Sequence, residues 1–349
     1  MLFSGAEKKF EIIIDGYRYI VKFQKNSEVG LIFNYVSEYL GSHIFQLLGI
    51  PVQETFLGTY EGKNVVVMKN FLEPEDDLVA FNGVGESSLE RDKELYQYTY
   101  EDITAMLREN MKSTNVEETI DRFWDMFIVD ALIGNFDRHG GNWGFIKKDN
   151  QYRIAPVYDN GSSLYPKLNT DEKLEAVLSS EEEIDQRIYK FPTSHIKVKN
   201  RKSSYFEVIS SLQFEACNDA LKRIVPRIDF NQINTLIDEV EGISEVRKRF
   251  YKVMLQQRYE KILMYAYRQL WHGKEWLMRP VTHDYQSLNE YTLPLQGKPY
   301  YRSSGIIYAV DRNGNKYAVG RVDLERFDDQ NFQYVFTPEL SVIDTLPSS

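Results

Sequence analysis

Cysteine is nearly missing from this chain, since Cys217 is the only one among 349 residues. A single thiol excludes an intramolecular disulfide and a zinc site built from several cysteines. Such scarcity is typical of proteins that work in a reducing compartment.

Excess positive charge and long apolar runs are lacking as well. The chain has 42 Lys and Arg residues against 52 Asp and Glu residues, for a net charge of -10. General nucleic-acid binders need a basic surface to neutralise phosphates, so we expect no direct DNA binding. Charges interrupt every long apolar run, and the start MLFSGAEKKFEIII lacks the basic and apolar regions of a signal peptide. We therefore predict a soluble cytoplasmic protein with no membrane partner.

The N-terminal part favours a small antiparallel sheet with one helix. Residues 10–14 and 17–23 have strand patterns and flank Asp15-Gly16, the dipeptide of a tight hairpin. Apolar residues recur at helical spacing over 31–48, before Gly49, and two further strand patterns follow at 52–60 and 64–71. The acidic stretch 73–94 predicts a boundary, so we expect an N-terminal lobe over residues 1–95.

Helical patterns dominate the middle of the chain. They cover 99–111, 117–134, 171–190, 205–222, 230–241 and 243–271, with short strands predicted at 143–147 and 152–159. Strand patterns return after residue 276, with a hairpin signal at Asn313-Gly314. The sequence therefore predicts an α+β protein with a helical lobe over residues 96–275 and a C-terminal β-rich accessory segment over residues 276–349.

One glycine-punctuated stretch, GNFDRHGGNWGF (134–145), gathers polar groups directly after an apolar helix pattern. The spacing Asp137-x-x-x-x-Asn142 suits a phosphoryl-transfer loop, in which a carboxylate orients the nucleophile's proton and an amide oxygen holds a divalent ion. Asp159, at the predicted strand end RIAPVYD, would add a second metal-binding carboxylate. These hard oxygen ligands suit Mg²⁺. We expect His139 to fix the loop backbone rather than to act as a base.

Asp and Asn are also common turn formers, and for this loop alone a purely structural role is an equal alternative. The order of polar residues along the chain favours chemistry. Lys22 at a strand end and Glu38 in the next helix precede the loop and Asp159, as in protein kinases. We therefore expect Lys22 and Glu38 to pair.

The segments FWDMFIVDALIGNFDRHGGNWGFI and YRIAPVYDNGSSLYP resemble the catalytic core of HipA-like serine/threonine kinases, the toxins of bacterial toxin-antitoxin pairs. The similarity covers roughly residues 1–270 and is closest to the short CtkA-type members. It implies a bilobal protein-kinase-like fold, ATP and Mg²⁺ as cofactors and a protein substrate. It also implies that Asp137 is the catalytic base and that Asn142 and Asp159 hold Mg²⁺.

The same resemblance assigns the nucleotide contacts. Lys22 would contact the ATP phosphates, and Ser4-Gly5-Ala6-Glu7-Lys8 is similar to the family's phosphate-facing loop. The connector Met68-Lys69-Asn70-Phe71 would hydrogen-bond adenine through its backbone. In this family a serine near the phosphate loop is autophosphorylated and the kinase is switched off. Ser4, the only hydroxyl in MLFSGAEKK, is the corresponding candidate here.

Partners and location are less constrained. The N-terminal subdomain that HipA uses in its antitoxin complex has no counterpart before the phosphate loop, so antitoxin binding does not carry over in its usual form. A separately encoded antitoxin-like partner and secretion as an effector both remain open. A small-molecule kinase of the aminoglycoside or choline type and a nucleotide-binding pseudokinase are the alternative functions.

Overall fold

The structure, a computed structural model, describes residues 9–84, 116–149, 151–198, 201–272, 279–280, 301–310, 316–326 and 332–338. The chain divides into two compact units, Met1–Arg268 and Gln269–Ser349. Each unit is described by itself below. The helix predicted at 99–111 lies outside the described residues.

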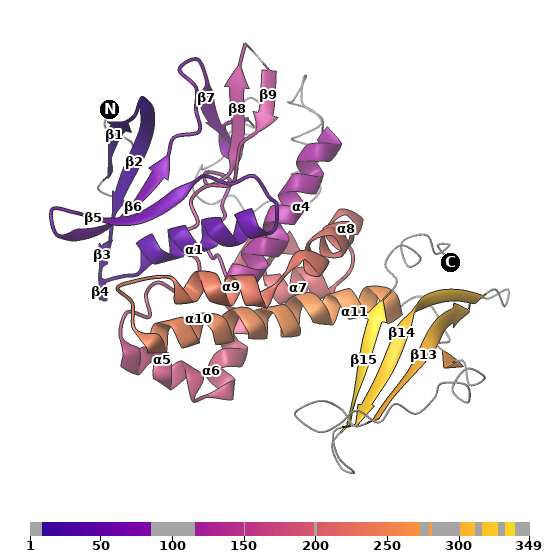
Figure 1. The fold of residues 1–349 in the computed structure, drawn as a ribbon. Coiled ribbons are helices and arrows are strands. Elements are labelled where there is room, and N and C mark those ends of the chain that lie inside the picture. The colour runs from indigo at the N-terminus through magenta and orange to yellow at the C-terminus, as the bar shows by residue number, and fades with distance from the viewer. Residues whose placement is uncertain are drawn as a thin grey trace. The chain divides into compact units, whose positions relative to one another are not determined.

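A four-stranded antiparallel sheet begins the first unit, with strand order β1-β2-β6-β5 (Figure 1). Its strands are β1 (Lys9–Ile14), β2 (Tyr17–Phe23), β5 (Thr55–Tyr60) and β6 (Lys63–Lys69). Asp15 and Gly16 both have positive φ, which the predicted tight turn between β1 and β2 requires. The short strands β3 (Asn26–Ser27) and β4 (Gly30–Leu31) form a second hairpin.

Helix α1 (Asn34–Leu47) packs against β5 and β6. Val36, Leu40 and Ile44 recur at helical spacing and are completely buried, so this apolar stripe holds the helix to the sheet. Gly49 follows with φ of +72°, a left-handed conformation that ends helices and favours glycine. The helix predicted over 31–48 is therefore present, in slightly shorter form.

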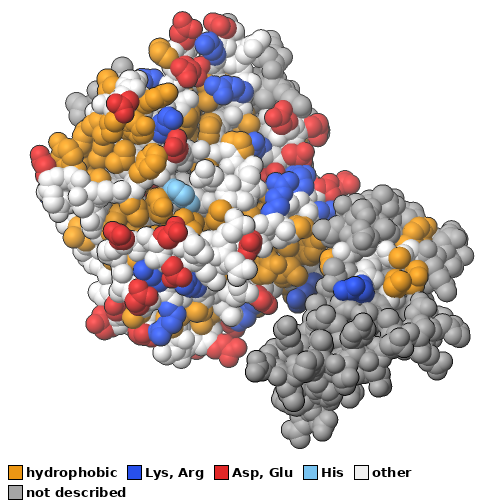
Figure 2. All heavy atoms as spheres, in the orientation of Figure 1, with side chains coloured by type: hydrophobic (Ala, Val, Ile, Leu, Met, Phe, Trp, Pro, Cys, Tyr) orange, Lys and Arg blue, Asp and Glu red, His pale blue; other side chains and the backbone are white. Residues whose placement is uncertain are grey.

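Hydrophobic side chains gather on the surface over the N-terminal sheet, at the left of Figure 2. The exposed members of this sheet are Ile13, Ile14, Tyr17, Phe56 and Tyr60. The opposite face of β2 carries Lys22, which is nearly buried. Successive side chains of a strand alternate between faces, so Ile14, Tyr17, Phe56 and Tyr60 lie on one face of the sheet, whereas Ile13 lies on the same face as Lys22.

A second, three-stranded sheet has the order β7-β8-β9 and consists of β7 (Asp77–Ala80), β8 (Gly144–Lys148) and β9 (Gln151–Ile154). The strand predicted over 152–159 was too long. Pro156 has no N–H to donate to a ladder, and beyond it only Val157 forms a single parallel bridge, to Val52. Asp159 therefore lies in a loop, with φ of 58°, and not at a strand end.

Most of the other described elements of the first unit are helices (Figure 1). They are α2 (Phe81–Val84), α4 (Val116–Ile133), α5 (Asp171–Leu178), α6 (Glu181–Asp185), η1 (Gln186–Lys190), α7 (Tyr205–Ser210), α8 (Glu215–Ile224), η2 (Val225–Arg227), α9 (Phe230–Asp238), α10 (Glu245–Arg258), η3 (Tyr259–Met264) and α11 (Tyr265–His272). The wide apolar stripe of α4, which includes Trp124 and Ile128, is buried as predicted. Helix α4 ends at Gly134, which has φ of +65° and leads into the glycine-punctuated loop.

Several predicted helices are divided into shorter ones. The Ser180 side chain accepts a hydrogen bond from Glu183 N and caps the start of α6. This cap separates α6 from α5. Leu212 has φ of 53° and separates α7 from α8. Strands β10 (Thr193–Val198) and β11 (Arg201–Ser204) pair as an antiparallel hairpin between η1 and α7.

The described part of the second unit is mainly an antiparallel sheet with order β12-β13-β14-β15. Its strands are β12 (Arg279–Pro280), β13 (Tyr301–Val310), β14 (Lys316–Arg326) and β15 (Phe332–Pro338). The predicted turn at Asn313-Gly314 lies outside the described residues, although the two strands it joins pair with each other. In the described part of the chain, no helix has the length and apolarity needed to cross a membrane.

Candidate active site

A large cavity of about 1090 Å³ lies within the first unit. Its walls come from β2, β6, α1 and the loops that contain residues 136–142 and 158–162. The predicted site residues that line it are Lys22, Glu38, Met68, Phe71, Asp137, His139, Asn142 and Asp159. Residues far apart in the sequence thus meet at one concave surface, which is the usual form of a small-molecule site.

Lys22 joins three elements of the first unit at the cavity wall. Its Nζ lies 3.6 Å from Glu38 Oε2 and 3.2 Å from Asp159 Oδ1. The predicted Lys22–Glu38 pair is therefore present, and Asp159 is a second partner. Burial lowers the pKa of the Lys22 ammonium, but the two carboxylates outweigh burial and leave the pKa above its ordinary value. Lys22 therefore carries a positive charge at neutral pH.

Glu38 is completely enclosed beneath Lys22. Burial raises the pKa of its carboxyl, although Lys22 acts in the opposite direction. Its Oε1 accepts a hydrogen bond of 2.7 Å from Asn160 N. A Cβ at Gly161 would come within 3.1 Å of Glu38 Oε2, and one at Gly41 would come within 2.7 Å of Asn160 Cβ. Glycines at these two positions permit α1 and the loop of Asp159 to approach this closely.

Asp159 faces the cavity with a side chain that is 39% exposed. Burial tends to raise the pKa of this carboxyl, but contact with Lys22 reverses the effect and holds the pKa below its ordinary value. Asp159 is therefore ionised at neutral pH. Lys22 occupies its Oδ1, so an anionic oxygen remains at the cavity for a cation or a hydrogen-bond donor.

The predicted catalytic loop is held by its own polar groups. Asn135 Oδ1 accepts from Asp137 N at 3.0 Å, and Asn142 Nδ2 donates to Asp137 O at 2.8 Å. His139 Nδ1 accepts from Gly141 N at 3.0 Å, which is the backbone-fixing contact expected of His139. Because the nitrogen of the Asn142 amide faces Asp137 O, its oxygen Oδ1 is directed elsewhere.

The side chain of Asp137 makes few contacts. It is 46% exposed, and His139 Nε2 lies 3.8 Å from Asp137 Oδ1. Partial burial raises the pKa of the Asp137 carboxyl, with a further contribution from Asp159, while His139 lowers it. The loop thus presents a carboxyl group to the cavity without a strong internal partner.

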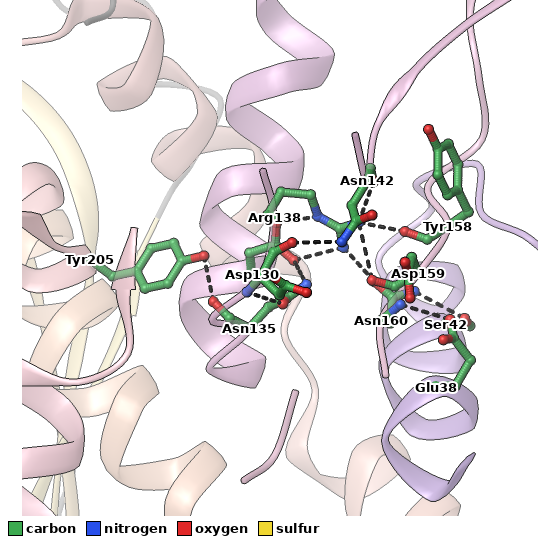
Figure 3. Close-up of polar contacts among 11 residues, drawn as sticks. Glu38, Ser42, Asp130, Asn135, Arg138, Asn142, Tyr158, Asp159, Asn160 and Tyr205 are labelled. Atoms are coloured by element: carbon green, nitrogen blue, oxygen red, sulfur yellow. Dashed lines mark hydrogen bonds and ion pairs between the residues drawn. The ribbon is translucent and has the colours of Figure 1, made fainter. Parts of the chain in front are cut away.

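Sequence reasoning missed the buried network behind the loop, which centres on Arg138 (Figure 3). Its Nε donates to Asp130 Oδ2 at 2.8 Å, and its other nitrogens donate to Asn142 O, Tyr158 O and Asn160 Oδ1. Tyr205 OH supports the same loop by donating to Asn135 O at 2.7 Å. A charged residue between Asp137 and His139 was the available signal, together with Asp130 inside an otherwise apolar helix stripe.

The connector after β6 is only partly as predicted. Met68, Asn70 and Phe71 line the cavity, but Lys69 does not. Lys69 N donates to Glu54 O at 2.9 Å, and Lys69 O accepts from Gln53 Nε2 at 3.0 Å. Both backbone groups of Lys69 are thus already hydrogen-bonded, and the contact between Lys69 and adenine stays a prediction. Asn70 to Leu72 is the part of the connector that reaches the cavity.

The predicted phosphate-facing loop, with Ser4, Gly5, Ala6 and Lys8, lies outside the described residues. Of the segment that leads out of this loop, Lys9 lines the cavity.

The residues at the cavity suit a magnesium ion that is shared with a bound ligand. The described residues contain no group of three His, Cys, Asp or Glu side chains that could hold a metal alone. The Asn142 amide oxygen and the Asp159 carboxylate both line the cavity and are hard oxygen donors. Mg²⁺ in kinases is commonly bound by one or two such groups together with substrate phosphates and water. The donor set therefore fits that ion.

Known proteins resemble this chain in sequence and fold. The chain matches the family described as HipA-like C-terminal domain over residues 1–242. It is 38% identical over 273 residues to the serine/threonine-protein kinase CtkA of Helicobacter pylori, which covers 76% of this chain and 83% of the relative. The crystal structure of a Helicobacter pylori proinflammatory kinase CtkA matches with a TM-score of 0.69 at 37% identity, over 76% of this chain and 94% of that one.

A more distant likeness concerns the fold alone. HipA in the Shewanella oneidensis complex of HipA, HipB and operator DNA matches with a TM-score of 0.53 at 16% identity, over 77% of this chain and 67% of that one. The close kinase relative covers most of this chain in both sequence and structure, so the protein is an enzyme of the phosphotransferase class. The chain belongs to the HipA-like C-terminal domain family.

Proposed function

We propose that the protein is an ATP- and Mg²⁺-dependent serine/threonine protein kinase whose active site is the 1090 Å³ cavity. The observation that carries this proposal is the position of Lys22, between buried Glu38 and Asp159 on a wall shared with Asp137 and Asn142. The named activity of the CtkA relative supports the choice of a protein hydroxyl as acceptor. Residues 1–95 and 96–275 would then act as the two lobes of a kinase around the cavity.

The residues divide the work of the transfer as follows. Lys22 neutralises the phosphates of ATP, and Glu38 fixes the position of its ammonium group. Asp137 orients the Ser or Thr hydroxyl and accepts its proton. The bond from the hydroxyl oxygen to the γ-phosphorus forms as the bond from that phosphorus to the β-γ bridging oxygen breaks. ADP leaves with the electron pair of the broken bond.

Asn142 and Asp159 would hold Mg²⁺, which neutralises charge on the phosphates when it is bound. Adenine would lie beside Met68 and Phe71 and hydrogen-bond with backbone groups of Phe71, because the N–H groups of Asn70 and Leu72 already donate to Arg18 O and Asn70 Oδ1. The raised pKa of Asp137 and the lowered pKa of Asp159 support different roles for the two carboxylates. The first accepts a proton more readily, and the second stays ionised as a metal ligand.

A toxin or effector role and an antitoxin-like partner are further proposals, supported by the family and by the names of its relatives. Autophosphorylation at Ser4 is another. A phosphate there would add a charge of about -1.5 to -2 that competes with ATP for Lys22. Mass spectrometry after incubation with Mg²⁺ and ATP tests it, because a phosphate found only on other residues, such as Ser162, would rule out Ser4.

The function is tested by incubating the full chain with γ-labelled ATP, Mg²⁺ and a bacterial lysate. We expect label on serine or threonine of a lysate protein, and no label when a chelator removes Mg²⁺. Label on small molecules alone would favour the aminoglycoside- or choline-type alternative. ATP binding without transfer to any acceptor would favour the pseudokinase. The Asp137→Ala variant is the control for contaminating kinases.

A further inference from the structure

A second groove, with a volume of about 480 Å³, adjoins the cavity. Phe136 and Lys167 line both spaces, so the two are neighbours that share part of one wall. Phe136 directly precedes Asp137 in the chain, and neighbouring Cα atoms are about 3.8 Å apart. An extended peptide advances about 3.3 Å per residue. A chain whose hydroxyl met Asp137 would therefore place a side chain in this groove within one or two residues.

The wall of the groove is an aromatic surface. The Phe191 ring is 48% exposed and lies 5.8 Å from the Phe136 ring and 6.4 Å from the Tyr165 ring, measured between centroids. Half-exposed aromatic rings in a concave site are typical anchors for apolar side chains of a partner. The surface is therefore suited to a large apolar residue.

Partly buried hydrogen bonds hold the wall in place. Tyr165 OH donates to Arg187 O at 2.8 Å, and Arg258 Nη1 donates to the same oxygen. Arg247 Nη2 donates to Leu168 O at 2.8 Å. A groove that is already formed loses little entropy when a peptide binds.

Charge at the rim of the groove favours an anionic partner. Arg187 is neutralised by Glu183, at 2.6 Å. Lys190 is exposed and has no ion pair within the described residues. Among the residues that the structure describes, Lys167 pairs only with Glu28, at 3.1 Å, and both side chains are mostly exposed. Such surface pairs contribute about 0 to 1 kcal/mol, so a substrate carboxylate exchanges readily with Glu28.

We propose that this groove binds the part of the protein substrate beside the phosphorylated hydroxyl. A large apolar side chain packs against Phe136 and Phe191, and a neighbouring Asp or Glu lies beside Lys167 and Lys190. The proposal rests on the proposed kinase function and adds a substrate class to it, namely serine or threonine flanked by one large apolar residue and one acidic residue.

The test uses the full chain, Mg²⁺, ATP and a set of peptides with one central serine or threonine, in which each flanking position is varied in turn. We expect the wild type to select large apolar residues at one flanking position and Asp or Glu at another. Phe191→Ala should raise the peptide KM about tenfold, with kcat and the KM for ATP nearly unchanged. Lys190→Glu should exchange the acidic preference for Lys or Arg.

Two matched controls separate the groove from general surface effects. Phe56→Ala removes an aromatic side chain of similar exposure, 44%, from the N-terminal sheet, and Lys63→Glu changes an exposed charge there. Both should leave the peptide KM and selectivity unchanged.

Other outcomes overturn the assignment. If the wild type phosphorylates peptides without apolar or acidic preference, or if Phe191→Ala leaves the KM unchanged, the groove is not the substrate site and the kinase function stands. If Phe191→Ala changes the mass in light scattering and not the peptide KM, the groove is an interface between copies of the chain. If the wild type transfers phosphate to no peptide or lysate protein, the kinase function fails, and the groove assignment fails with it.

Discussion

Two groups of charged residues meet at the catalytic loop and differ in how they are held. Behind the loop, Arg138 and Asp130 are almost completely buried and are joined by direct hydrogen bonds. At the cavity, Asp137 and Asp159 are 46% and 39% exposed at their side chains. The buried pair fixes geometry at the cost of desolvation, whereas the exposed carboxylates stay accessible to ligands. Neighbouring residues of one loop thus have different roles: Arg138 holds the loop in place, and Asp137 is exposed to ligands in the cavity.

The largest effect should come from breaking the buried group. Arg138→Ala leaves Asp130 as an unpaired buried charge and removes donors to three parts of the site. We expect the free energy of unfolding to fall by about 3 to 5 kcal/mol, measured by urea titration. Arg249→Ala, which breaks an exposed pair with Glu175, is the control and should cost less than about 1 kcal/mol. If both variants lose the same free energy of unfolding, the Arg138 network contributes no more to stability than an exposed ion pair.

Replacing Asp137 should reduce the rate of phosphoryl transfer strongly and the stability of the fold very little. In Asp137→Ala we expect the rate of phosphoryl transfer to fall by about 10² to 10⁴, since a group that takes a proton is lost. Stability should stay within about 0.5 kcal/mol of the wild type, because the side chain supports little packing. Single-turnover transfer and thermal unfolding of the same preparation measure both. Near-normal transfer would remove Asp137 from the site.

Asp159→Asn tests whether Asp159 is a metal ligand, in contrast to Asp137, which accepts a proton. Because the amide carries no charge, Mg²⁺·ATP should bind about tenfold more weakly or worse, and its dependence on Mg²⁺ should weaken. Calorimetric titration measures both quantities. Asp149→Asn, at an exposed turn, is the control. An unchanged affinity with an unchanged Mg²⁺ dependence would contradict the metal assignment.

A pH-dependent effect concerns His195, which packs beside the loop with its ring 6.0 Å from that of His139. Burial lowers the pKa of His195 from 6.5 to about 4, helped by nearby Lys202 and His139 and opposed by a hydrogen bond with the Phe136 backbone. Between those two pH values the unfolded chain binds more protons than the folded one. His195 therefore contributes stability above about pH 6.5 that is lost as pH falls towards 4, on the order of 3 kcal/mol at most.

Urea titrations at pH 7, 6 and 5 of the wild type and His195→Asn measure this contribution. The variant keeps a donor near Phe136 but does not titrate, so its stability should fall less steeply with pH. Identical slopes in the two proteins would assign the pH dependence to other groups.

The sequence predicted those features that depend on local pattern. The β1–β2 hairpin follows from Asp15-Gly16, and α1 follows from the spacing of Val36, Leu40 and Ile44. The order of Lys22, Glu38, Asp137 and Asp159 favoured phosphoryl-transfer chemistry over a purely structural role, and all four side chains line one cavity. The resemblance to HipA-like kinases added the fold, and the family is confirmed.

Features set by tertiary contacts could not be predicted in the same way. Lys69 has the pattern of a connector residue, but Gln53 and Glu54 engage its backbone from a neighbouring segment. The sequence pattern predicted that Asp159 ends a strand, whereas β9 ends at Ile154, before Pro156, which cannot donate a backbone hydrogen bond. Arginine side chains are mostly exposed in proteins, and only the structure shows that Arg138 is buried against Asp130.

The most direct measurement uses an ATP analogue whose terminal phosphate is activated as an acyl phosphate, which acylates an amine lying beside the phosphates. We predict that mass spectrometry finds Lys22 acylated and that excess Mg²⁺·ATP prevents the reaction. Glu38→Gln should reduce acylation of Lys22, because the ammonium group loses the carboxylate 3.6 Å away that positions it. Acylation only at lysines outside the cavity, such as Lys190, or acylation of Lys22 that ATP does not reduce, would contradict the assignment of this cavity as the phosphoryl-transfer site.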